Sequence, residues 1–86
     1  MKSLIIQLNS IEKVKAFVNI ISVCDGEFDL GSDRYVVDAK SIMGIFSLDL
    51  SNPLQLNVHN EDEFETVSQK LETFVVQPEY EHNYEQ

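Results

Sequence analysis

Two segments of this chain carry apolar residues at the three- and four-residue spacing of an amphipathic helix, and this pattern most limits the folds open to it. The apolar positions are Ile11, Val14, Phe17, Val18 and Ile21 in the first segment, and Phe64, Val67, Leu71, Phe74 and Val75 in the second. Each helix has one apolar stripe, so each must cover an apolar surface that the rest of the chain supplies. Pro78 is expected to end the second of these helices.

Four short segments have the composition or the alternation of β-strands, namely residues 4–8, 27–30, 34–37 and 54–58. The turn residues Gly31-Ser32-Asp33 predict a hairpin between the second and the third of them. A short helix is expected over residues 41–46. The resulting order, β-α-β-β-α-β-α, predicts an α+β fold: an open-faced two-layer sandwich whose four-stranded, largely antiparallel sheet has all helices on one face.

The length of 86 residues is that of a single domain. We expect this domain to span residues 1–77, followed by an acidic, disordered tail over residues 78–86. Cys24 is the single cysteine, so an internal disulfide is impossible and a small, buried residue is expected there. Because no apolar run is long enough to span a membrane or to act as a signal peptide, we expect a cytoplasmic location.

The charge of the chain limits its partners and its chemistry. Fifteen acidic and six basic residues give a formal net charge of −9. Nucleic acids and anionic membranes are therefore not expected as partners, because both require clustered lysine and arginine. The acidic residues between Asp25 and Asp33 lack the spacing of a calcium loop, and the chain has neither a glycine-rich phosphate loop nor a plausible Ser-His-Asp set. We expect no metal, no cofactor and no enzymatic activity.

The most specific segment is residues 39–48, Ala-Lys-Ser-Ile-Met-Gly-Ile-Phe-Ser-Leu, in which Ser41 stands at the start of a short apolar helix. Lys-Ser-Ile-Met-Gly, followed by two apolar residues, Ser and Leu, resembles the HPr-like phosphocarrier domains of the bacterial sugar phosphotransferase system. The element order of the family matches residues 1 to about 77 in spacing. The resemblance implies the HPr-like fold, no cofactor, and partner proteins from the phosphotransferase system or from catabolite control.

This resemblance fails at the residue that does the family's chemistry. The family carries phosphate on a histidine just before its first helix, in a pattern like Gly-Leu-His-Thr-Arg-Pro-Ala. Alignment on Phe17-Val18 puts Ser10 at the histidine and Glu12 at the arginine. A serine ester would not transfer its phosphate readily, and a carboxylate would repel it. Ser10 and Glu12 are thus interpreted as a degenerate phosphocarrier position, while His59 and His82 fall at a strand end and in the tail.

A second family feature is retained. In many members from Gram-positive bacteria, a serine at the start of the second helix is phosphorylated by a dedicated kinase, and Ser41 matches that position. Phosphate there would meet free backbone N–H groups, with Lys40 as a nearby cation. The alternative is a plain helix cap. In the family, residues matching Ile42, Met43 and Phe46 dock partners. Period and resemblance together predict that Met43 and Phe46 are exposed, whereas Ile45 and Ile42 face the core.

These observations favour a non-catalytic HPr-like regulatory or protein-interaction domain, a monomer or a weak homodimer, with phosphorylation of Ser41 as its candidate mode of control. Its predicted partner-binding patch comprises Lys40, Ile42, Met43 and Phe46. Such histidine-less relatives are regulatory partners in carbon catabolite repression in some bacteria. Two alternatives remain open: a small ligand-binding regulatory domain, which would form a dimer stabilised by a metabolite, and an active phosphocarrier that uses Ser10.

Overall fold

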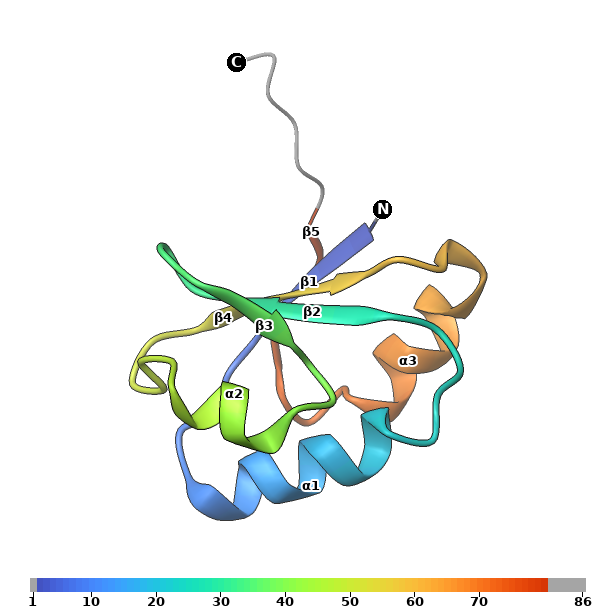
Figure 1. The fold of residues 1–86 in the computed structure, drawn as a ribbon. Coiled ribbons are helices and arrows are strands. Elements are labelled where there is room, and N and C mark those ends of the chain that lie inside the picture. Colours follow the sequence, from blue (N-terminus) through green and yellow to red (C-terminus); the bar gives the residue numbers. More distant parts are fainter. Residues whose placement is uncertain (1, 81–86) are drawn as a thin grey trace, which may run out of the picture.

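A computed structural model describes residues 2–80, which form two layers: a β-sheet and, on one of its faces, a layer of helices (Figure 1). The elements in chain order are β1 (Lys2–Ile6), α1 (Ile11–Ile21), β2 (Phe28–Gly31), β3 (Val36–Asp38), α2 (Ile42–Phe46), β4 (Leu54–Val58), the 3₁₀ turn η1 (Glu61–Glu63), α3 (Phe64–Lys70) and β5 (Val75–Tyr80). The predicted α+β class, antiparallel sheet and one-sided helix layer are confirmed.

The strands lie in the order β3-β2-β4-β1-β5, and every neighbouring pair is antiparallel. Leu56 in β4 lies opposite Leu4 on one side and opposite Leu30 on the other, so the three leucines form one row on the helix-facing side. All three are fully buried. The alternation of Leu54–Val58 continues this arrangement along β4, whose polar residues face away from the helices.

The expectation of four strands is wrong, because the sheet has five. The second of the two predicted amphipathic helices, α3, ends at Lys70 rather than at Pro78, and the chain then returns along β1 as β5. Phe74 and Val75 fit a helical stripe in the sequence, but so short a run also fits a strand. Two physical factors favour the strand: β-branched residues cluster at positions 73–76, and β1 would otherwise leave a row of backbone groups unpaired.

The fifth strand also bears on the predicted boundary of the domain. β5 includes residues 78–80, which the sequence analysis assigned to the tail, and Tyr80 is paired with Ser3. The remainder of that predicted tail, residues 81–86, lies outside the described residues. The fold therefore uses the chain at least as far as Tyr80.

The core lies between the sheet and the helices. α1 buries Val14, Phe17 and Ile21, and the ring of Phe17 meets that of Phe74 edge-on, with 6.3 Å between ring centroids. α3 adds Phe64 and Val67 to the same core. None of the helices in the described part of the chain has the length and apolar character needed to cross a membrane.

We expect Phe17→Ala to lower the free energy of unfolding by about 3–5 kcal/mol, because it empties a fully enclosed site at the centre of the core. Met43→Ala is the matched control, since the Met43 side chain is 78% exposed and its truncation should cost about 0.5 kcal/mol or less. Urea denaturation followed by circular dichroism measures both. Equal losses in the two variants would contradict this assignment of the core.

Candidate functional site

The candidate site is the surface formed by α1 and α2, which pack against each other. The two helices run in opposite directions. The end of α2 meets the start of α1, while the start of α2 lies near the residues that follow α1. A shallow hollow occupies the first of these junctions and is lined by Asn9, Ser10, Ile11, Phe46, Leu50 and Ser51. The degenerate phosphocarrier position and Ser41 therefore stand near opposite ends of one surface.

At the first junction, Ser10 acts as the N-cap of α1. Its Oγ accepts a hydrogen bond from the backbone N–H of Lys13 at 3.1 Å, so the hydroxyl oxygen already has a structural use. Glu12 is exposed in the first turn of the same helix. Ile11, between them, is 58% exposed. Helical spacing predicted that Ile11 belongs to the apolar stripe facing the core, so its exposure was not expected.

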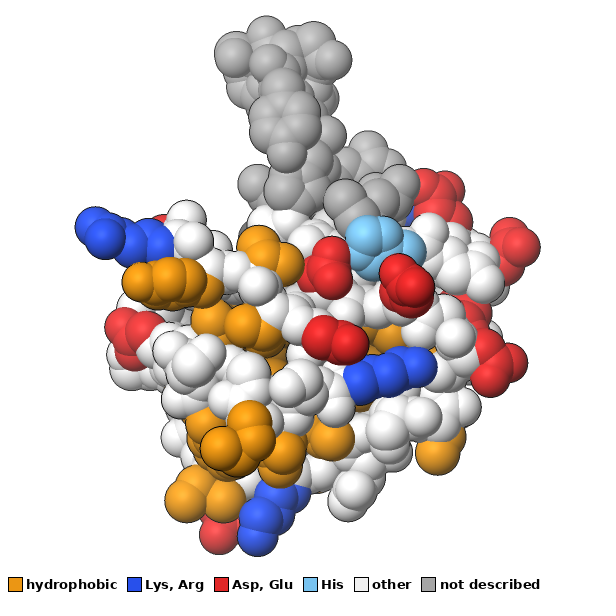
Figure 2. Space-filling model, in the orientation of Figure 1, with side chains coloured by type: hydrophobic (Ala, Val, Ile, Leu, Met, Phe, Trp, Pro, Cys, Tyr) orange, Lys and Arg blue, Asp and Glu red, His pale blue; other side chains and the backbone are white. Residues whose placement is uncertain are grey.

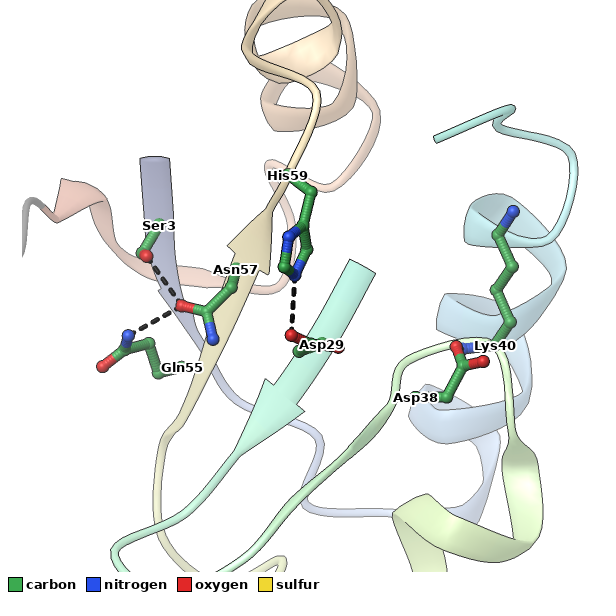
Figure 3. A network of polar contacts seen from close by, with 7 residues as sticks. All are labelled: Ser3, Asp29, Asp38, Lys40, Gln55, Asn57 and His59. Carbon is green, nitrogen blue, oxygen red and sulfur yellow. Dashed lines mark hydrogen bonds and ion pairs between the residues drawn. The ribbon is translucent and has the colours of Figure 1, made fainter. Parts of the chain in front are cut away.

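Histidine is distant from this junction in the described chain. His59 follows β4 on the outer, helix-free side of the sheet, where its Nε2 lies 2.6 Å from Asp29 Oδ2 (Figure 3). His82 lies outside the described residues. The outer side also carries a short polar network, in which Ser3 Oγ and Gln55 Nε2 both donate to Asn57 Oδ1. Residues 2–80 contain no group of histidine, cysteine or carboxylate side chains able to hold a metal ion.

Ser41 is exposed and acts as the N-cap of α2. Its Oγ accepts a hydrogen bond from the backbone N–H of Gly44 at 3.2 Å. Gly44 permits this close packing, because a Cβ there would stand 3.2 Å from both Ser41 Oγ and Val37 Cβ. The backbone N–H of Ser41 donates to Asp38 O, which joins the start of α2 to the end of β3. The hydroxyl is thus accessible to solvent and held in one orientation.

Lys40 is held by its own chain. Its Nζ donates to Cys24 O at 2.6 Å and stands 5.7 Å from the centre of the Phe28 ring. The side chain therefore ties the start of α2 to the segment after α1, which lies 16 positions earlier in the sequence. Cys24 is half-buried, and its Sγ donates weakly to Ile20 O. Sequence spacing gives no indication of the Lys40 contact.

The apolar side chains of α2 divide between core and surface. Ile45 is fully buried and Ile42 packs partly against the core, whereas Met43 and Phe46 are 78% and 41% exposed. Figure 2 shows hydrophobic side chains gathered over α2 and the start of α1, with both basic and acidic side chains at their edge. Lys15 lies one helical turn after Ile11 and so shares its side of α1. The surface is apolar with a basic margin.

The loop after α2 shapes the edge of the hollow. Asp49 accepts hydrogen bonds from Ser51 Oγ and from the backbone N–H of Ser51, at 2.6 and 3.1 Å, and also from the Asn52 amide. These bonds, the one from the Ser51 hydroxyl above all, favour the ionised carboxylate and lower the pKa of Asp49. The resulting turn holds Leu50, whose partly buried side chain lines the hollow.

Comparison with known proteins agrees with this architecture. No protein-family model matches the sequence, and no curated protein matches it significantly. Among solved structures, the chain is similar to the crystal structure of HPr-C-His from Thermoanaerobacter tengcongensis, with 30% sequence identity and a TM-score of 0.71. The match covers 85% of this chain and 89% of that one. The fold is that of a small open-faced phosphocarrier sandwich, and the chain belongs to the HPr family.

We expect Lys40→Met to lower the free energy of unfolding by about 1–2 kcal/mol, because it removes a charge-assisted hydrogen bond and a cation–π contact but keeps the apolar stem. Lys15→Met is the matched control on the exposed surface of α1 and should change stability by about 0.5 kcal/mol or less. Chemical denaturation compares the two variants with the parent chain. A Lys40 variant as stable as the Lys15 variant would show that the contact contributes nothing.

Proposed function

We propose that this chain is a non-catalytic, regulatory member of the HPr family that acts in the bacterial cytoplasm by binding partner proteins through α2 and the start of α1. The main support for this proposal is a cluster of exposed apolar side chains, Ile11, Met43 and Phe46, on a chain with a net charge of −9. Exposed apolar groups of this kind mark interaction sites, and methionine adapts to differently shaped partners. The basic margin supplied by Lys15 suits a partner with acidic residues around an apolar anchor.

Phosphate transfer by the family mechanism is disfavoured by the residues at the start of α1. A carrier needs an imidazole, whose phosphoramidate is labile enough to pass the phosphate on. Ser10 offers a hydroxyl that already caps the helix, and Glu12 brings a negative charge beside it. Exposed Ile11 places an apolar side chain in the same hollow. These features support docking rather than chemistry at this junction.

Incubation with labelled phosphoenolpyruvate and the first enzyme of the phosphotransferase system should leave this chain unlabelled, whereas the HPr of the same host becomes labelled in a parallel reaction. The expected result follows from the serine and the glutamate at the carrier position. Label that maps to Ser10 and disappears in Ser10→Ala would overturn the non-catalytic assignment and favour an atypical carrier.

Control of the docking surface is proposed to come from phosphorylation of Ser41. The exposed Ser41 caps the N-terminus of α2, the helix that carries Met43 and Phe46, so a phosphate there would change the surface that partners meet. The modification would replace a neutral cap by a group of about −1.5 to −2 charges with three acceptor oxygens. Because the Lys40 ammonium is already bound to Cys24 O, an arginine of the partner is the better match for the new anion.

Treatment with ATP and the serine kinase that acts on HPr in the host should add the mass of one phosphate, mapped to Ser41. Ser41→Asn is the matched control: asparagine caps a helix as well as serine does but has no hydroxyl, so it should fold normally and gain no mass. Intact-mass spectrometry measures both. No added mass on the parent chain, with the kinase active on HPr, would leave Ser41 as a helix cap alone.

A further inference from the structure

The two edges of the sheet differ in how well they are protected. β5 forms one edge; it contains Pro78, which has no N–H to offer, and its pairing with β1 is interrupted by two register shifts. β3 forms the other edge and is paired to β2 without interruption, from Val36 opposite Gly31 to Asp38 opposite Asp29. β3 contains neither proline nor lysine, two residues that commonly protect such an edge.

The hydrogen-bond pattern shows which groups of β3 face outward. Ser32 N–H donates to Tyr35 O and Ala39 N–H donates to Phe28 O, so residues 35, 37 and 39 bond toward β2. By the alternation of an antiparallel ladder, the N–H and C=O of Val36 and the N–H of Asp38 point away from the sheet. The outward group Asp38 O accepts from Ser41 N–H. The edge therefore offers a donor and an acceptor at Val36 and a further donor at Asp38.

The side chains at this edge are apolar and exposed. Val36 is 64% exposed and Tyr35 is 62% exposed, although both residues are of types that favour paired strands. The Val37 side chain points to the helix side of the sheet, where it packs against Gly44 of α2. Val36 lies on the opposite side of β3 from α2. Tyr35, in the preceding turn, lines a hollow with Ser47 and Asp49, which follow α2, and neither exposed residue is part of the docking surface proposed above.

We propose that β3 pairs antiparallel with β3 of a second copy of this chain, about a twofold axis at Val36. In that register Val36 lies opposite Val36 of the other copy and exchanges two backbone hydrogen bonds with it. The turn before β3 then lies beside the end of the other β3, so that Tyr35 comes next to Val37 and the long Arg34 side chain can reach Asp38. The twofold axis repeats the last contact, so each arginine meets a carboxylate and each carboxylate meets an arginine.

The charges of the chain make this register selective. Arg34 is the only arginine in the sequence, is exposed, and lies in the turn between Ser32 and Tyr35, two positions before the edge strand, in a chain of net charge −9. General association of two such chains is opposed by repulsion, so a stable contact needs a specific placement of opposite charges. Asp38 stands opposite Asp29 within its own sheet, where His59 contacts Asp29. Asp38 is thus an exposed carboxylate with a like-charged neighbour, and Arg34 of the second copy would offset it.

Sedimentation equilibrium over a range of concentrations should show a reversible monomer–dimer equilibrium for the unmodified chain. Arg34→Asp and Asp38→Arg should each weaken it about tenfold or more, because each places like charges at both symmetry-related contacts. A mixture of the two variants should regain association, since the heterodimer has opposite charges at both contacts. The double variant Arg34→Asp/Asp38→Arg should likewise dimerise.

Val36→Lys supplies a test that does not depend on Asp38, whose Oδ1 also accepts from Lys40 N–H. The Val36 side chain is exposed, so the variant should remain folded, as a thermal unfolding curve would check, while two facing cations block the pairing. An unmodified chain that stays monomeric at all concentrations would overturn the proposal. So would a dimer that survives Val36→Lys, or a folded pair of charge variants that does not associate when mixed. None of these results depends on whether Ser41 is phosphorylated.

Discussion

The burial of only one face of the sheet is the constraint on which the rest of this molecule depends. On that face α1 buries three apolar side chains and α3 buries two, and the Phe17 ring meets Phe74, which follows α3, edge-on. Little of the sheet remains for α2, whose five residues can direct only Ile45 fully into the core. Its other large side chains must therefore remain wholly or partly exposed, and the apolar surface over α2 is a geometric consequence of a short helix on a crowded face.

Much of the fold could be predicted from the sequence because local pattern and final packing agree. Leu54–Val58 alternates cleanly and forms a strand with the expected bounds, and Ser41 caps α2, as its place before the short apolar run indicated. The fifth strand could not be predicted from the same patterns. Phe74 is buried, as its place in the apolar stripe predicted, but it lies between α3 and β5 rather than within a helix. Here the pairing of β5 with β1 outweighs the local helical spacing.

Less of the candidate site could be predicted from the sequence, because several of its contacts join residues far apart along the chain. The exposure of Met43 and the burial of Ile45 follow from helical period, which acts over a few residues. The bond from Lys40 to Cys24 O joins residues 16 positions apart, and the hollow that exposes Ile11 depends on Phe46 and Leu50, more than thirty positions later. Such contacts are set by tertiary packing. The family resemblance nominated this surface as a candidate, but it could not show that the Lys40 ammonium is already bound to Cys24 O.

The exposed apolar side chains of α2 and those at the edge strand β3 lie on either side of the corner where β3 leads into α2. Val37 packs closely against Gly44, and Ser41 N–H donates to Asp38 O at the corner between β3 and α2, so the two elements are joined directly. Val37 packs against the core on the helix side, Val36 is exposed on the helix-free side of the sheet, and Met43 is exposed on the outer surface of α2. The net charge of −9 places an excess of acidic side chains around these exposed apolar groups, which disfavours general association with other acidic proteins. A small chain can thereby present two distinct contacts without exposing one continuous apolar patch.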